Sequence, residues 1–560
     1  MAASFRDTMA AGYALAEPAL VIGSPMEAAA PLPDVRVQVG LSMLNRHGLI
    51  AGATGTGKTK TLQLMAGQLS HAGVPVLIAD IKGDLTGLAL PGDATNQKVI
   101  DRCTSLGWEF RADGHPIELL SLSGKLGAQV RATVHSFGPV LLGKILDLNE
   151  TQTSVLSLVF KYCDDHDLPL LDLADLRTTL KYLGSEEAKE ILADYGGIGP
   201  ATLGVILRSI ITLEQEGSDV FFGETEFDVD DLMRTTPGGQ GIISVLEISD
   251  VMDKPRLFST FMLWMLAQLY HSLPEAGDLP KPKLCFFFDE AHLLFDDASK
   301  ALLERVEQTV RLIRSKGVGV YFVTQAPTDL PASVLAQLGN RVQHALRVFT
   351  PEDADNLRKT VRTFPMTDFF DVEETITSLG TGEALVTVLS PRGVPTPLAP
   401  TRLLPPDSMM AALSPQELDL RIAAGSLAAK YAETVDPQSA HEIITARIQA
   451  ARAAVAGMEG GMAGQAGTAM TPAQERRAIE ARARELERIR REAERAARAQ
   501  ARSDAAARKA AEREAARLER ERQRTRTEAI RSASRIATSR AGQSILRDVL
   551  GTLFGGGRRH

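Results

Sequence analysis

The sequence predicts an α/β fold built on a mostly parallel sheet, with an α-helical insertion and a C-terminal tail that forms a long helix. Three observations support this fold class. A short apolar run at 48–51 enters a glycine-rich loop and then a helical segment. Later apolar runs of strand length alternate with helix-length segments, as in a parallel sheet covered on both faces. Residues 137–234 instead show helical periodicity, and residues 472–530 are rich in Ala, Arg and Glu.

The glycine-rich loop has the spacing G-x-x-x-x-G-K-[ST], which defines the phosphate-binding P-loop. Glycines let backbone N–H groups approach an anion without a Cβ in the way, and the helix expected from about Lys58 to Ser70 points its positive end at the same place. A glycine-rich turn before an ordinary helix is the alternative interpretation. The predicted nucleotide-binding residues are Gly52, Ala53, Thr54, Gly55, Thr56, Gly57, Lys58, Thr59 and Lys60.

A second motif follows the continuous hydrophobic strand expected at 283–288, which delivers Asp289 and Glu290. Asp289 is predicted to hold the hydration shell of Mg²⁺ together with the hydroxyl of Thr59, while Glu290 polarises the attacking water. Lys58 supplies a charge for the β- and γ-phosphates. These residues predict an ATPase that uses ATP and Mg²⁺.

A polar residue, Gln325, ends the next expected strand, at 319–323. We expect it to face the γ-phosphate and to sense its loss; a hydrogen-bonded polar strand end is the alternative. The strand expected at 74–81 ends in the charged segment Asp80–Asp84, which would lie beside the nucleotide crevice or form a polar turn. Further strands are expected at 35–39, 117–122, 129–135, 241–248 and 383–389, with another segment of the core at 341–349 and an apolar helix at 255–270.

The domain boundaries follow from these patterns. We divide the chain into an N-terminal lead-in (1–46), the first part of the ATPase core (47–136), the α-helical insertion (137–234), the second part of the core (235–405), a helical extension (406–456), a Gly-rich linker (457–471) and a basic Ala/Arg/Glu-rich helical tail (472–560). Apolar positions in the tail, such as Leu486 and Leu518, are sparse for a coiled coil.

Composition narrows the class of protein. A chain of 560 residues that is 44% hydrophobic can bury a large core. Its three cysteines form no C-x-x-C pair, which argues against a disulfide framework and a zinc-cysteine site. No apolar run is long enough to cross a bilayer, so a cytoplasmic location is expected. The net charge of −8 is uneven: residues 471–560 carry 24 Lys+Arg and 13 Asp+Glu, a net +11, which leaves −19 for the rest.

Two common ATPase classes are disfavoured. ABC-type ATPases carry an L-S-G-G-Q element shortly before the paired acids, but the nearest similar segment here, 122–125, lies far upstream of Asp289. Residues 289–292 spell D-E-A-H, as in one class of two-lobed helicases. However, Thr324-Gln325 stands where that class has Ser-Ala-Thr, and no second-lobe Q-x-x-G-R-x-G-R motif follows.

The chain resembles the HerA/FtsK superfamily of P-loop ATPases, and within it the YjgR-type proteins with a HerA-like ATPase domain. The resemblance depends on the segments 47–59, 80–85, 289–292, 323–327 and 382–384 and on the basic tail. It implies a RecA-like core and a hexameric ring of identical subunits with ATP bound between neighbours. It also implies that double-stranded DNA moves through the ring. It also implies an arginine finger, for which Arg341 is preferred and Arg347 and Arg314 stay open; an ordinary surface or ion-pair role is the alternative for each of the three. No N-terminal β-barrel of the HerA kind is evident, and the insertion is additional.

The predicted function is therefore an ATP-driven DNA translocase or helicase-like motor. The alternative is a P-loop ATPase switch that acts on protein partners, with the C-terminal helix as a docking arm; the acidic body motivates it. A non-enzymatic scaffold is disfavoured by the intact motifs. The tail could bind DNA, a membrane surface or another subunit, although its mixed Glu and Arg fit a solvated helix best.

Overall fold

The computed structural model describes residues 4–185, 188, 195, 197–215, 220, 222–251, 254–295, 300–433, 435 and 437–463. Residues Met1–Ala451 form one compact unit, and Arg452–His560 form a second, of which only the stretch to Ala463 is described. The predicted linker beyond Ala463 and the predicted tail lie outside the described residues.

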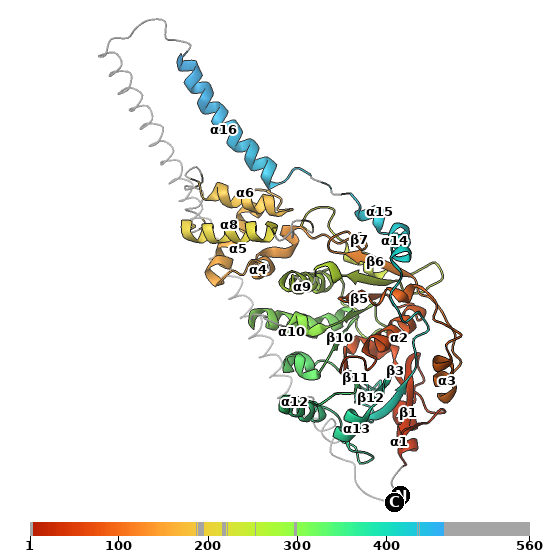
Figure 1. Cartoon of the computed structure of the whole chain (residues 1–560). Coiled ribbons are helices and arrows are strands. Elements are labelled where there is room, and N and C mark those ends of the chain that lie inside the picture. The colour runs from red at the N-terminus through yellow and green to blue at the C-terminus, as the bar shows by residue number, and fades with distance from the viewer. Residues whose placement is uncertain are drawn as a thin grey trace, which may run out of the picture. The chain divides into compact units, whose positions relative to one another are not determined.

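The first unit is organised around a 13-stranded sheet in the order β2-β1-β13-β12-β11-β4-β10-β9-β5-β8-β6-β7, with β3 paired to β1 (Figure 1). Neighbouring strands are parallel from β11 through to β7. On the other side of β11, the pairs from β11 through β12, β13 and β1 to β2 are antiparallel. The strands are β1 (Ala19–Glu27), β2 (Ala30–Pro31), β3 (Val37–Gly40), β4 (Gly48–Ala51), β5 (Val76–Asp80), β6 (Ile117–Ser121), β7 (Ala128–Gln129), β8 (Ile243–Glu247), β9 (Leu284–Phe288), β10 (Val318–Thr324), β11 (Asn340–His344), β12 (Glu383–Thr387) and β13 (Ala399–Leu403). The predicted α/β fold with a mostly parallel sheet is confirmed.

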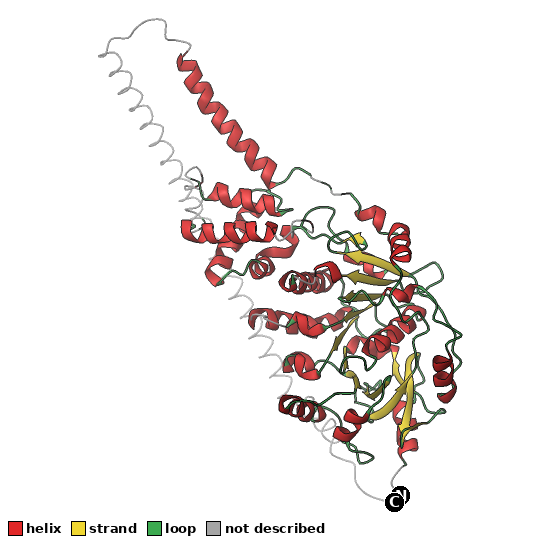
Figure 2. Cartoon of the chain, in the orientation of Figure 1, coloured by secondary structure: helices red, strands yellow, loops and turns green. Residues whose placement is uncertain are grey.

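Helices cover both faces of this sheet (Figure 2). The α-helices are α1 (Phe5–Tyr13), α2 (Lys58–His71), α3 (Gln97–Ser105), α4 (Val134–Ile145), α5 (Glu150–Asp165), α6 (Leu173–Leu183), α8 (Pro200–Gln215), α9 (Pro255–Ser272), α10 (Lys300–Ile313), α11 (Ala332–Leu335), α12 (Pro351–Val361), α13 (Val372–Ser378), α14 (Pro415–Ala424), α15 (Ala428–Tyr431) and α16 (Ala440–Ala463). Among the described residues, none of them combines the length and apolarity that crossing a lipid bilayer requires.

Alternate residues of the central strands enter two hydrophobic cores. In β9, Phe286 and Phe288 pack with α9 and α10, while Cys285 and Phe287 pack on the face that carries α1 and α2. A strand buried on both faces needs apolar residues at every position, which explains the unbroken apolar run of β9. The first of these cores continues into α4, α5, α6 and α8, so the helices of the predicted insertion share the core of the sheet.

Several elements differ from expectation. Residues 129–135 were expected as a strand, but β7 has only two residues and α4 begins at Val134, because Thr133 caps that helix by accepting from the N–H of Ser136. The strands β1 and β13 pair with each other, so residues of the predicted lead-in (1–46) are part of the sheet of the core. Helix α16 runs to Ala463 and so covers the start of the predicted linker.

Candidate ATP-binding and hydrolysis site

The carboxyl ends of five neighbouring parallel strands bring the predicted site residues together. Strand β4 leads into the P-loop, β10 into Gln325, β9 into Asp289 and Glu290, β5 ends at Asp80 and β8 ends at Glu247. The register places Ala51 beside Thr324 and Asp80 beside Glu247. In open α/β sheets this edge is where ligands bind.

The P-loop has the backbone geometry of an anion cradle. Gly52, Gly55 and Gly57 have φ values of +156°, +77° and +112°, the last two in the left-handed region that favours glycine. Thr54 and Gly55 lie exposed at the tip, while Lys58 is buried at the start of α2. The ammonium of Lys58 donates to the carbonyls of Gly52 (2.7 Å) and Ala53 (3.3 Å). The loop thus directs both the helix N-terminus and a lysine charge toward one place.

The P-loop is fixed from the side by His344, at the end of β11. Burial lowers the pKa of His344 to about 4, so the ring is neutral at physiological pH. Its Nδ1 then donates to the carbonyl of Thr56 (3.1 Å), and its Nε2 accepts from the hydroxyl of Thr61 (2.9 Å). A Cβ on Gly52 would lie 2.4 Å from the Cβ of His344, so this position requires glycine. The sequence carried no signal for this residue, because its partners are more than 280 positions away.

Glu290 lies opposite Lys58 and forms an ion pair with Lys82, from the segment that follows β5. Its backbone is left-handed, with a φ of +46°, a strained state of the kind that concentrates at functional sites. Burial acts to raise the pKa of Glu290, but the hydrogen bond from Lys82 and the charges of Lys82 and Lys58 outweigh it and hold that pKa below its ordinary value. Glu290 is therefore ionised at neutral pH. Lys82 lies in the charged segment Asp80–Asp84 that the sequence predicts beside the nucleotide crevice or in a polar turn, but the sequence alone gives Lys82 no role of its own.

Asp289 belongs to a group of buried carboxyls. Burial raises its pKa to about 7, against the attraction of Lys82. Asp80 accepts from the backbone N–H groups of Lys82, Gly83 and Leu85, yet burial still raises its pKa to about 6. Glu247 was not identified from the sequence; burial and the neighbouring charge of Asp80 raise its pKa to about 8. So many buried acids at one place suit a site that binds a cation, because buried charges need a partner of opposite sign.

The same acids fit Mg²⁺. Carboxylate oxygens of Asp80, Asp84 and Asp289 all lie within 4.8 Å of one another. Among the described residues, Oδ2 of Asp289 is buried and has no hydrogen-bond partner, as expected of an oxygen that faces a hydrated ion. Oxygen is the donor atom that Mg²⁺ requires. Asp289 and the half-buried Thr59 would hold the ion, and Asp84 adds a carboxylate that we had not predicted as a ligand.

A cavity of about 280 Å³ opens beside the N-terminus of α2. Polar groups come from Lys60 and Arg102, and apolar walls from residues such as Val99, Leu404 and Met410. The ammonium of Lys60 contacts the side chain of Gln63 (3.0 Å) and the carbonyl of Met410. Lys60 thus lines this cavity next to the phosphate loop.

The predicted sensor, Gln325, is exposed and directly follows β10, the strand between β4 and β9. This position is compatible with the predicted contact to a γ-phosphate. The neighbouring Thr324 instead has a structural partner, since its hydroxyl donates to Asp329 (2.7 Å), which also accepts from the N–H of Ala326 (2.7 Å). The sensing role of Gln325 stays a prediction.

The preferred arginine finger, Arg341, is engaged within its own chain. Its guanidinium donates to the carbonyls of Leu338 (3.0 Å), Leu335 (3.1 Å) and Thr363 (3.0 Å). The two other candidates differ: Arg347 is exposed and donates to the carbonyl of Thr377 (3.0 Å), and Arg314 is exposed after α10. The finger assignment stays a prediction, and the three bonds add a structural role for Arg341.

We expect replacement of Arg341 with Ala to lower the free energy of unfolding by about 3 kcal/mol, because three carbonyls lose a charged donor. Urea denaturation measures this loss, and Arg347→Ala, which removes one exposed bond, serves as the matched control. ATP turnover measured on the folded fraction tests the finger role separately. A thousandfold fall in turnover with unchanged stability would reverse the structural assignment.

Sequence comparison identifies related proteins. The DNA double-strand break repair helicase HerA of Sulfolobus acidocaldarius is 22% identical over 358 residues, which cover 63% of this chain and 64% of that protein. The helicase of the same name from Saccharolobus solfataricus is 22% identical over 363 residues, with the same coverage of 63% and 64%. The chain thus spans about 64% of the length of these curated relatives.

Structure comparison finds further similar proteins. The plasmid coupling protein TrwB in complex with ADP and Mg²⁺ is 14% identical, with a TM-score of 0.45 over 74% of this chain and 94% of that chain. VirB4 of Thermoanaerobacter pseudethanolicus is 15% identical, with a TM-score of 0.44 over 73% of this chain and 100% of that chain.

The family assignment covers nearly the whole chain, including the P-loop and the paired acids that form the site. Residues 26–560 match the family described as helicase HerA-like C-terminal. The chain therefore belongs to the helicase HerA-like C-terminal family.

Proposed function

We propose that this protein is an ATP-hydrolysing motor of the HerA/FtsK type that uses Mg²⁺ and acts on double-stranded DNA. One observation carries the ATPase part: the P-loop with Lys58 follows β4, and Asp289 and Glu290 follow β9, so these residues meet at the carboxyl edge of one parallel sheet, where the charges of both acids act on Lys58. A triphosphate chain bound by the loop would meet both. The DNA part is supported by the family and by the helicases to which the chain is similar.

In the proposed reaction each residue has a limited task. The N–H groups of residues 53–59 and the ammonium of Lys58 bind and orient the phosphates. The ionised Glu290 orients a water for in-line attack and takes up its proton. Asp289 and Thr59 would hold Mg²⁺, which supplies charge neutralisation when bound. Gln325 contacts the γ-phosphate side, and the cavity lined by Lys60 and Arg102 receives the nucleobase.

We further propose that identical subunits assemble into a ring, hexameric by the family resemblance, in the cytoplasm. Large apolar side chains between β11 and α13 support an assembly contact: Val348 is 41%, Phe349 88% and Met366 101% exposed. An assembly contact at this segment would remove these apolar side chains from water. An arginine from a neighbouring subunit would then reach the γ-phosphate.

The test is the ATPase rate of the full chain with and without duplex DNA. We expect DNA to raise turnover at low salt and the effect to fall steeply as salt increases, because phosphate contacts release counterions. Lys58→Ala is the matched control, since it removes the phosphate charge and should abolish turnover under both conditions. Light scattering with a non-hydrolysable nucleotide measures assembly in the same samples.

The alternative is an ATPase switch that acts on protein partners, which the net charge of −19 over residues 1–470 favours. In that case saturating DNA would leave the turnover unchanged at low salt, although Lys58→Ala would still abolish it. This outcome would retain the ATPase and reject the DNA motor.

A further inference from the structure

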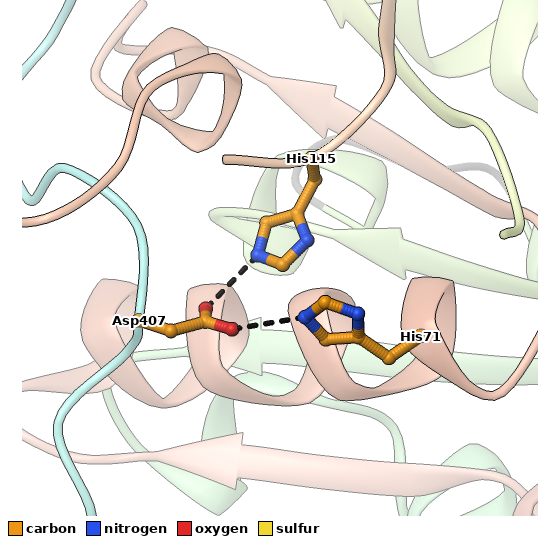
Figure 3. Close-up of side chains that lie close together, drawn as sticks. All are labelled: His71, His115 and Asp407. Atoms are coloured by element: carbon orange, nitrogen blue, oxygen red, sulfur yellow. Dashed lines mark hydrogen bonds and ion pairs between the residues drawn. The ribbon is translucent and has the colours of Figure 1, made fainter. Parts of the chain in front are cut away.

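A cluster of three side chains lies at the far end of the P-loop helix, away from the nucleotide site. His71 is the last residue of α2, His115 precedes β6, and Asp407 lies in the segment after β13. Figure 3 shows both imidazole rings turned toward the one carboxylate. Nε2 of His115 is 2.9 Å from Oδ1 of Asp407, and Nε2 of His71 is 3.2 Å from Oδ2. The proposed ATPase reaction uses none of these groups.

The backbone around Asp407 is fixed independently of its side chain. Its carbonyl accepts from the N–H groups of Gly92 (2.9 Å) and Asp113 (3.0 Å). We call residues 404–413, the segment that contains Asp407, the strap. Beyond Asp407 the strap contacts two further residues of α2: the carbonyl of Met409 accepts from the side chain of Gln63 (3.4 Å), and the carbonyl of Met410 accepts from Lys60. The carboxylate is therefore held in place before any ligand binds, and the strap also forms a wall of the cavity beside α2.

The three side chains offer the donor atoms and the spacing of a transition-metal site. One ring nitrogen of each histidine and a carboxylate oxygen of Asp407 lie within 4.8 Å of one another, so one ion at about 2.0–2.2 Å from each could be reached with small side-chain rotations. His115 is fully buried at its side chain, Asp407 is 26% exposed and His71 is 38% exposed, which leaves an entry path and room for a water as fourth ligand.

The charge of the cluster also suits a dication. A second carboxylate, that of Asp113, has an oxygen 3.5 Å from Nε2 of His71. Metal binding requires unprotonated imidazole nitrogens and ionised carboxylates, and a divalent ion then balances the two negative charges of Asp407 and Asp113. Nε2 of Gln240 lies 3.3 Å from Nδ1 of His71, and a flip of this amide would place its oxygen there to accept the ring proton while Nε2 of His71 binds the metal.

We propose that His71, His115 and Asp407 form a structural site for a divalent transition metal of the zinc class, which ties the strap to the C-terminal end of the P-loop helix. Imidazole nitrogen with one carboxylate is a ligand set that suits Zn²⁺ and is poor for Mg²⁺, so the site selects a different ion from the acids at the other end of α2. Bound metal stabilises the folded unit, because the unfolded chain does not hold the three ligands together.

The test uses the untagged full chain, stripped of metal and titrated with Zn²⁺ in excess Mg²⁺. We expect one equivalent of Zn²⁺ to bind tightly per chain and to raise the melting temperature. When Co²⁺ replaces Zn²⁺ as a spectroscopic probe, we expect the visible absorption of a tetrahedral ion. His71→Ala and Asp407→Asn should each weaken binding by at least about 100-fold. Both variants keep the backbone bonds of the strap, whereas changes at the buried His115 put folding at risk.

The matched control is His135→Ala. His135 is also an exposed imidazole beside a carboxylate, 3.7 Å from Asp164, but it belongs to no group of three possible metal ligands in the described part of the chain. The His135→Ala variant should therefore bind Zn²⁺ as tightly as the parent protein. The proposal is overturned if the parent protein binds no Zn²⁺ in excess Mg²⁺. It is also overturned if His71→Ala and Asp407→Asn are folded, as judged by circular dichroism, and bind Zn²⁺ as tightly as the parent. Because ATP turnover is not the readout, failure here is separate from failure of the proposed motor.

Discussion

Glu290→Gln is expected to lower ATP turnover by about 10²–10⁴-fold while nucleotide affinity stays close to that of the parent protein. A carboxylate that takes up a proton in the transition state contributes about this factor, and an amide cannot replace it. Binding should persist because the phosphate contacts come from the P-loop and Lys58, and a glutamine oxygen can still accept from Lys82. Turnover is measured by phosphate release and affinity by titration with a non-hydrolysable nucleotide.

The control for this substitution is Glu275→Gln. Glu275 also pairs with a lysine, Lys316 at 3.1 Å, but it is exposed and lies outside the site. We expect this variant to turn over ATP normally. Loss of nucleotide binding in Glu290→Gln would show that Glu290 helps to hold the nucleotide, and unchanged turnover would exclude it as the base.

Asp289→Asn is expected to make the metal-free protein more stable and to abolish its Mg²⁺-dependent turnover. Burial raises the pKa of Asp289 from an ordinary value of 3.8 to about 7, so ionising this carboxyl costs the folded state free energy that the unfolded state does not lose. A shift of about three pKa units corresponds to about 4 kcal/mol. The asparagine removes that cost but also removes the oxygen that faces Mg²⁺.

The difference in stability between Asp289→Asn and the parent protein is expected to grow with pH. Because the folded pKa lies above the unfolded one, the folded state binds more protons between these values, and the parent protein loses stability as pH rises from about 4 to about 7. The advantage of Asp289→Asn should therefore be about 4 kcal/mol at pH 8 and about 2 kcal/mol at pH 5.5. Urea denaturation at the two pH values without Mg²⁺ measures it.

A matched control separates this effect from general surface charge. Asp278 is 98% exposed at its side chain, so Asp278→Asn should leave stability unchanged at both pH values. Addition of Mg²⁺ should stabilise the parent protein and not Asp289→Asn. A variant that is less stable than the parent at pH 8 would mean that Asp289 makes favourable contacts which the geometry does not reveal.

Local patterns in the sequence determined the nucleotide loop, the paired acids and the parallel part of the sheet. Each depends on residues that are neighbours in the chain: a glycine spacing before Lys58, or an apolar run such as 284–288 that only a strand buried on both faces explains. Because carboxyl ends of parallel strands share one edge, the meeting of Lys58, Asp289 and Glu290 also followed from order along the chain.

Only the tertiary structure decided which distant groups support that site. His344 fixes the P-loop, Lys82 pairs with Glu290, and Glu247 joins the buried acids through a strand pairing that no local pattern specifies. The pairing of β1 with β13 was hidden for the same reason, since it joins segments nearly 380 residues apart and β1 contains Pro25, which weakens a strand prediction. The cluster of His71, His115 and Asp407 brings together three segments whose side chains carry no shared motif. Such contacts depend on how the whole chain packs, and a single sequence records that only indirectly.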